Sequence, residues 1–243
     1  MKSDFKTRAI LLSCISIVCL GAQTPTPAPV HKTTPKTGTS TARHKPLMTN
    51  PALYKATAPA VFRAKFTTTK GDVVVEVTRA WGPNGADRFY NLVKGGYFDG
   101  APIYRVIPNF MAQFGFSPSP AVSKVWDKAV IKDDPVTQSN KRGYITYAKP
   151  EVPPHNNRTT QLFINYKDNS FLDSQGFAPF GQVVEGMEVV DKFYGAYGDT
   201  DQGKLAEEGM AYVKTSLPKL DIITAAVILP PAPASPATPP TPK

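Results

Sequence analysis

Apolar and polar residues alternate in a series of short runs through the middle of the chain, a pattern typical of β-strands with one buried face. The first two runs, residues 62–68 and 72–77, are separated by Lys70 and Gly71, which predicts a β-hairpin. Further strand-like runs follow at residues 103–107, 111–114, 144–148, 162–165, 180–184 and 220–229.

Two segments have helical spacing instead. The first begins at Pro83 and Asn84 and stops at Gly95 and Gly96, and its apolar residues recur at helical intervals. The second, residues 187–194, is short. Many short strands with two helices predict a mainly β fold, a closed antiparallel β-barrel.

The N-terminus has the order of a secretory signal. Basic residues at positions 2, 6 and 8 precede an apolar run over residues 9–20, and the small residues Gly21 and Ala22 follow. We therefore expect residues 1–22 to be a signal peptide and the chain to be secreted or periplasmic. The alternative is a retained anchor, but the run is shorter than the roughly 20 residues that cross a bilayer. Membrane contact is expected only if the signal is retained.

Two further segments lack a pattern that could bury a core. Residues 23–60 are rich in Pro and Thr, and residues 230–243 contain seven prolines. We expect a disordered spacer in the first segment and a disordered tail in the second. This leaves residues 61–229 as one folded domain.

The positive charge of the chain lies mostly outside that domain. The formal net charge of +9 alone would suggest a nucleic-acid partner. Residues 61–229, however, hold 19 basic and 18 acidic residues, so the predicted domain is almost neutral. We expect no nucleic-acid partner.

The predicted domain lacks most of the residues that metal binding, nucleophilic catalysis and cofactor binding need. Cys14 and Cys19 both lie in the predicted signal, and His31 and His44 lie in the predicted spacer, so His155 alone could serve a metal site or a catalytic triad. The sequence has no phosphate-binding loop, dinucleotide fingerprint or nucleophile elbow. We therefore expect no metal and no cofactor.

One stretch, IYRVIPNFMAQ at residues 103–113, combines a cation, large apolar side chains and an amide. If it forms two strands and a turn, Ile103 and Arg105 share one face, and Met111 and Gln113 share one face. TQLFIN at residues 160–165 and SFLD further on continue the apolar pattern. Taken by residue type alone, such positions are usual in a core, and an arginine on a strand is usually in a surface ion pair.

In order and spacing these strings resemble the cyclophilin family of peptidyl-prolyl cis-trans isomerases, over nearly all of residues 62–229. The resemblance implies an eight-stranded antiparallel barrel capped by two α-helices, and an isomerase of proline-containing polypeptides that uses no cofactor. It implies that Arg105, Gln113 and Phe110 are the catalytic residues, with Arg105 as the catalytic arginine. The substrate-binding positions it implies are Met111, Ala148, Lys149, Gln161, Phe163, Phe171 and Leu172.

The physical task fits these residue types. An X-Pro bond is nearly balanced between cis and trans, but a barrier of about 18–20 kcal/mol makes the exchange slow. As the bond twists, the prolyl nitrogen regains a lone pair, which Arg105 can meet with a hydrogen bond. Lowering such a barrier needs no nucleophile or metal.

Some positions depart from the usual pattern of the family. Tyr104 stands where many members have histidine, Lys149 replaces a frequent asparagine, and GFAP at residues 176–179 lacks the histidine that many members have in the pocket. Phe171 replaces a tryptophan that binds cyclosporin in many relatives, so we expect weak cyclosporin binding.

Residues 116–139 form a longer and more proline-rich segment than a minimal member has, and we assign it no function. Its paired acids Asp133 and Asp134, beside Pro135, are interpreted as a solvated turn.

We interpret the chain as a monomeric isomerase that assists the folding of exported proteins. One alternative is a chaperone or scaffold that binds proline-containing segments with little catalysis. Another is a structural domain displayed at a cell wall by the spacer.

Overall fold

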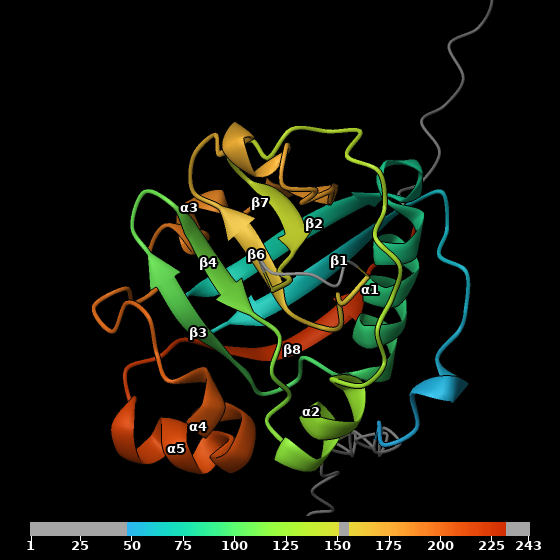
Figure 1. Cartoon of the computed structure of the whole chain (residues 1–243). Coiled ribbons are helices and arrows are strands. Elements are labelled where there is room, and N and C mark those ends of the chain that lie inside the picture. The colour runs from blue at the N-terminus through green and yellow to red at the C-terminus, as the bar shows by residue number, and fades with distance from the viewer. Residues whose placement is uncertain (1–47, 151–155, 232–243) are drawn as a thin grey trace, which may run out of the picture. The chain divides into compact units, whose positions relative to one another are not determined.

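The computed structural model describes residues 48–150 and 156–231 of the 243. Eight strands close into an antiparallel barrel in the order β1-β2-β7-β5-β6-β4-β3-β8 (Figure 1). Their bounds are β1 Val61–Thr68, β2 Gly71–Thr78, β3 Ala101–Ile107, β4 Met111–Phe114, β5 Tyr144–Tyr147, β6 Leu162–Asn165, β7 Pro179–Glu185 and β8 Ile222–Ile228. The predicted fold class and all the predicted strands are confirmed.

Period-two alternation is the reason the strands could be read from the sequence. Strand β1 buries every second residue, which places Phe62, Ala64 and Phe66 in the main core. The ring of Phe66 meets Phe98 and Phe114 edge-on at centroid distances of 5.8 and 5.7 Å, so aromatic side chains fill the barrel interior.

Helix α1, Pro83–Gly95, forms where the sequence predicts it and stands beside the barrel (Figure 1). Pro83 suits the first helical turn, and Gly96 ends the helix in the left-handed region at φ 78°. The helix buries Phe89 and Leu92, and the Phe89 ring lies 5.3 Å from that of Phe180 on β7. Burial of this apolar face holds the helix on the barrel.

The described part of the chain contains five α-helices, more than the two helical segments that the sequence predicts. Helix α3, Met187–Val190, covers the first half of the second predicted helix. Three others were not predicted: α2 Pro120–Trp126, α4 Gln202–Glu208 and α5 Met210–Ser216. Each is only about two turns long, too short for a helical period to stand out. Their stability comes from packing, as in the second apolar cluster of Tyr104, Leu205, Val213, Leu217 and Leu220.

The folded part begins earlier than predicted, so the expected disordered spacer over residues 23–60 is wrong for residues 48–60. Met48 is buried, and its carbonyl accepts a 2.7 Å hydrogen bond from the indole of Trp126. Ala58 is also buried, and its N–H donates to Asp87. A few anchoring contacts order this segment without any apolar period. Residues 1–47, which include the predicted signal, and residues 232–243 lie outside the described residues, as does His155.

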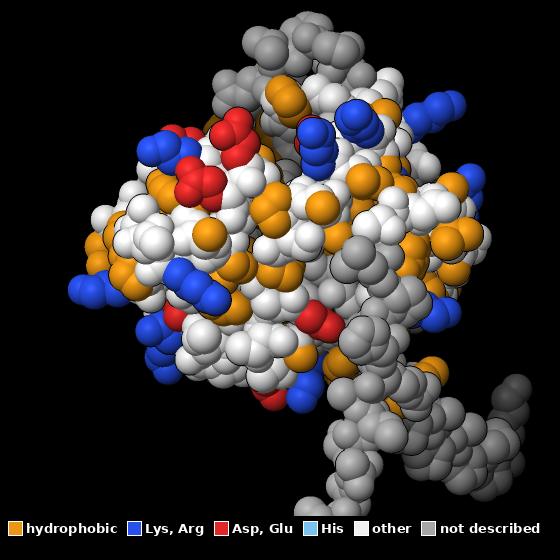
Figure 2. Space-filling model, turned by 90° about the horizontal axis from the view of Figure 1, so that it is seen from below, with side chains coloured by type: hydrophobic (Ala, Val, Ile, Leu, Met, Phe, Trp, Pro, Cys, Tyr) orange, Lys and Arg blue, Asp and Glu red, His pale blue; other side chains and the backbone are white. Residues whose placement is uncertain are grey.

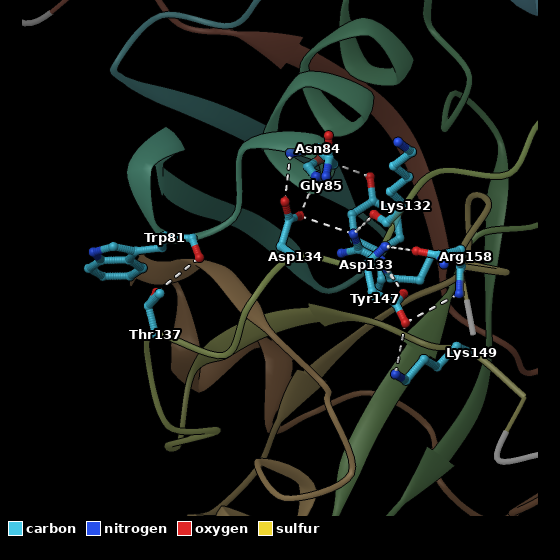
Figure 3. Close-up of polar contacts among 11 residues, drawn as sticks. Trp81, Asn84, Gly85, Lys132, Asp133, Asp134, Thr137, Tyr147, Lys149 and Arg158 are labelled. Atoms are coloured by element: carbon cyan, nitrogen blue, oxygen red, sulfur yellow. Dashed lines mark hydrogen bonds and ion pairs between the residues drawn. The ribbon is translucent and has the colours of Figure 1, made fainter.

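The paired acids are not a solvated turn (Figure 3). Asp134 is buried and accepts hydrogen bonds from the backbone N–H groups of Asn84 (3.0 Å) and Gly85 (2.9 Å), so it caps α1. It also pairs at 3.0 Å with the buried guanidinium of Arg158, which contacts Asp133 at the same distance. These acids tie the segment after α2 to the start of α1.

The face at the bottom of Figure 1, which includes α2, α4 and α5, carries side chains of both charges with hydrophobic ones between them (Figure 2). Among the residues that the structure describes, no helix combines the length and the apolar character needed to span a membrane.

Candidate active site

A β-bulge shapes the strand that carries Arg105. On β4, Gln113 pairs with Arg105 and the next residue, Phe114, pairs with Ile103, so Tyr104 is an extra residue on β3. Ile103 and Val106 both point into the main core, whereas Arg105 lies outside it. The prediction that Ile103 and Arg105 share a face is therefore wrong, because the bulge shifts the alternation.

On β4 the alternation is regular. Ala112 and Phe114 belong to the main core, and Met111 and Gln113 line a groove outside the barrel. The predicted shared face of Met111 and Gln113 is thus confirmed, and it sets Gln113 directly beside Arg105.

The groove has a volume of about 660 Å³. All the predicted site residues except Phe171 line it: Arg105, Phe110, Met111, Gln113, Ala148, Lys149, Gln161, Phe163 and Leu172. Phe171 is 54% exposed and stacks on the Phe110 ring at 6.1 Å, so it lies at the rim. The structure therefore brings the predicted residues together, and their roles stay predictions.

Phe177 forms one wall of the groove, although the sequence did not predict it as a site residue. It belongs to the same apolar cluster as Met111, Phe163 and Leu172, and its ring meets that of Phe163 edge-on at 6.0 Å. Its position within GFAP, where many relatives have a histidine nearby, could have marked Phe177 as a site residue. An apolar cluster of this kind suits the ring of a proline.

The side chain of Lys149 is held by the protein. Its ammonium lies 5.4 Å from the centre of the Phe177 ring and 3.3 Å from Asp133 (Figure 3). Only 7% of the side chain is exposed. The segment with no assigned function thus supports one wall of the groove.

Arg105 is held between two side chains. Its Nη1–H donates to Gln113 Oε1 at 3.2 Å, and its Nε–H pairs with Asp199, on the loop before α4. A guanidinium has five N–H donors, so others remain for a substrate. Asp199 was not predicted, and neither were the groove residues Asp127, Val130 and Gln202, because they lie in segments with no recognised string.

Tyr104 connects the two glutamines of the site. Gln113 Nε2–H donates to the Tyr104 hydroxyl, which donates in turn to Gln161 Oε1 at 2.7 Å. Burial raises the pKa of Tyr104 far above its ordinary value, and the nearby Arg105 charge lowers it by less. The hydroxyl therefore stays protonated at every working pH.

The groove therefore places an apolar pocket beside the N–H donors of the Arg105 guanidinium. Across residues 48–150 and 156–231, no three His, Cys, Asp or Glu side chains are grouped to hold a metal ion. The expectation that the chain uses no cofactor stays a prediction.

Comparison with known proteins agrees with this geometry. The family model "Cyclophilin type peptidyl-prolyl cis-trans isomerase/CLD" matches residues 63–213, more than half of the chain. The barrel and its lateral groove define a cyclophilin-type fold. This chain belongs to the cyclophilin-type peptidyl-prolyl cis-trans isomerases, and its enzyme class is isomerase.

Relatives of known name are similar over much of their length. A peptidyl-prolyl cis-trans isomerase of Acinetobacter baylyi is 33% identical over 144 residues, which cover 58% of this chain and 76% of the relative. Peptidyl-prolyl cis-trans isomerase B of Escherichia coli is 29% identical over 170 residues, covering 67% of this chain and 96% of the relative.

Solved structures share the fold at lower identity. A cyclophilin from Hirschia baltica superposes with a TM-score of 0.53 at 17% identity, covering 72% of this chain and 78% of the other. A Cryptosporidium parvum cyclophilin type peptidyl-prolyl cis-trans isomerase, solved in the presence of the dipeptide Ala-Pro, gives 0.52 at 20% identity, covering 69% and 99%.

Proposed function

We propose that this chain isomerises X-Pro bonds in exported polypeptides, and that Arg105 stabilises the twisted prolyl amide. The observation that carries the proposal is the single groove in which the Arg105 guanidinium adjoins the apolar cluster of Met111, Phe163, Leu172 and Phe177. The pocket binds the proline ring, and the cation donates to the prolyl nitrogen as its lone pair forms. A Cryptosporidium parvum cyclophilin of the same fold was solved in the presence of the dipeptide Ala-Pro, which supports a proline-containing ligand for a fold of this kind.

The energies match the task. Raising an exchange rate from about 0.01 to about 100 per second takes four decades, or about 5.4 kcal/mol. A charge-assisted hydrogen bond formed chiefly in the twisted state contributes about 1.5–3 kcal/mol. Immobilising the proline ring against Phe110 and its neighbours, with Gln113 steering the preceding carbonyl, supplies the remainder. The rate thus comes from differential binding alone.

Export of the chain is supported by the sequence of residues 1–22, which has the charge and apolar pattern of a secretory signal. Cell fractionation tests this part. We expect the chain in the periplasm or medium and shortened near Ala22; a full-length chain in the cytoplasm would refute it. Recovery with the wall fraction would favour the structural alternative.

The catalytic part is tested with the purified chain and a short X-Pro peptide. We expect a large acceleration of cis-to-trans exchange, which Arg105→Ala lowers by two or more decades. If the natural chain binds the peptide without accelerating the exchange, it is a proline-binding scaffold, and the catalytic proposal fails.

A further inference from the structure

The hydrogen bonds among Arg105, Gln113, Tyr104 and Gln161 all run in one direction. Arg105 donates to the Gln113 oxygen, the Gln113 nitrogen donates to the Tyr104 hydroxyl, and that hydroxyl donates to the Gln161 oxygen. A glutamine amide has one donor end and one acceptor end, so each partner fixes which end faces it. The Tyr104 hydroxyl thus hydrogen-bonds to the side chains of both glutamines.

We propose that Tyr104 is a positioning residue of the isomerase: it fixes the amide groups of Gln113 and Gln161, and through Gln113 it fixes the guanidinium of Arg105. The inference rests on the proposed function of Arg105. It assigns a role to a residue that stands next to Arg105 and is not among the residues that line the groove.

The backbone of Tyr104 is anchored by the loop before α4. As the extra residue of the β-bulge it lies outside the regular β3–β4 pairing, and its carbonyl accepts a 2.8 Å hydrogen bond from the Thr200 hydroxyl. Thr200 directly follows Asp199, the ion-pair partner of Arg105. The loop before α4 therefore holds both Tyr104 and Arg105.

The ring of Tyr104 is anchored as well. It is fully buried in the cluster formed with α4 and α5, against Leu205 and Val213, and its centroid lies 5.0 Å from that of Phe116. An aromatic ring with a fixed backbone and fixed packing leaves its hydroxyl one position. The two short helices that the sequence did not predict thus hold a group that reaches the active site.

The direction of the chain of donors depends on a neutral hydroxyl. A phenolate could not donate to Gln161, and burial holds the pKa of Tyr104 far above its ordinary value. With the Gln161 oxygen taken by Tyr104, its amide nitrogen is the end left to donate to a ligand in the groove that Gln161 lines.

Tyr104→Phe removes the hydroxyl and keeps the ring. The Gln113 nitrogen and the Gln161 oxygen then lose a shared partner, and both amides are free to turn. Because Arg105 acts chiefly on the twisted state, we expect kcat to fall about 10-fold, the worth of one hydrogen bond, while KM changes less than about 2-fold.

The matched control is Tyr147→Phe. Tyr147 is also fully buried, and its hydroxyl donates to the carbonyl of Gly85 on α1 at 3.1 Å. The Tyr147→Phe variant also loses one buried hydroxyl, but this hydroxyl bonds to α1 and not to the two glutamines. We expect a similar loss of stability in urea for both variants, with kcat within about 2-fold of the natural chain for Tyr147→Phe.

The experiment measures kcat and KM by NMR exchange on an X-Pro peptide, and the side-chain amide signals of Gln113 and Gln161 in the free chain. Lower kcat and shifted amide signals in Tyr104→Phe alone support the inference. Natural kcat in Tyr104→Phe, or equal losses in both variants, would overturn it. If Tyr104→Phe is too unstable for the activity assay, the amide signals of Gln113 and Gln161 are compared with those of the natural chain at low temperature. Unchanged signals would overturn the inference as well. Arg105→Ala is assayed in parallel: full activity there refutes the proposed function itself, whatever Tyr104 does.

Discussion

Replacing Asp134 with alanine should destabilise the fold strongly, although the residue lies in a segment that reads as a surface turn. Its carboxylate accepts from two backbone N–H groups at the start of α1 and pairs with Arg158, whose side chain is 3% exposed. Loss of a helix cap costs about 1 kcal/mol. Loss of one partner of a buried ion pair costs about 3–5 kcal/mol.

The two costs do not add fully, because Arg158 keeps Asp133 at 3.0 Å and the carbonyl of Lys132. We therefore expect Asp134→Ala to lower the free energy of unfolding by about 3–4 kcal/mol. Asp134→Asn keeps an acceptor and should lose less.

Urea unfolding followed by circular dichroism measures the change, provided that the slope with denaturant stays constant. The control is Asp72→Ala, which breaks an exposed 3.2 Å pair with Lys65 on the first hairpin. That variant should change stability by less than about 1 kcal/mol. Equal effects of the two substitutions would refute the reasoning from burial.

Three further outcomes follow from the structure. Phe177→Ala opens one wall of the proline pocket, so KM should rise about 10-fold, or 1.4 kcal/mol, with a smaller change in kcat, and an unchanged KM would contradict this assignment. Asp199 is 69% exposed, so its pair with Arg105 is weak. Asp199→Ala should lower kcat by no more than about 5-fold and should remove part of the salt dependence of the rate, whereas a loss as large as that of Arg105→Ala would show a larger role. Burial raises the pKa of Asp87, but the hydrogen bonds from Arg79 and from Ala58 outweigh burial and leave it below its ordinary value. Because the folded state then binds this proton less readily than the unfolded state, the stabilisation is present above the ordinary aspartate pKa and is lost as the pH falls below about 4; Asp87→Asn should flatten that part of the stability curve measured by acid titration.

The strands and the first helix could be predicted because a few neighbouring residues in the sequence mark each of them. Alternation along β1, or the proline and glycines that bound α1, can be read from a few neighbouring residues. The helices α4 and α5 depend instead on an apolar cluster with Tyr104, which is about a hundred residues away in the chain. No local pattern marks such a contact.

The same distinction holds at the site. The strings around Arg105 and Phe163 predicted part of the groove, but the bulge at Tyr104 placed Ile103 on a different face from Arg105. A bulge changes which residue pairs with which, and a single sequence carries no record of pairing. Asp199 reaches Arg105 only through the fold of its loop, so residue type alone could not place it there.

The central claim is that Arg105 stabilises the twisted amide more than the bound substrate. Arg105→Lys keeps the charge and removes the planar donor group that Gln113 and Asp199 hold in place. The decisive measurement is the exchange rate of a bound X-Pro peptide by NMR, together with its Kd, for the natural chain and this variant. We predict a fall in kcat of at least about 10-fold with Kd changed less than about 3-fold. Equal losses in binding and rate, or an unchanged rate, would contradict the account.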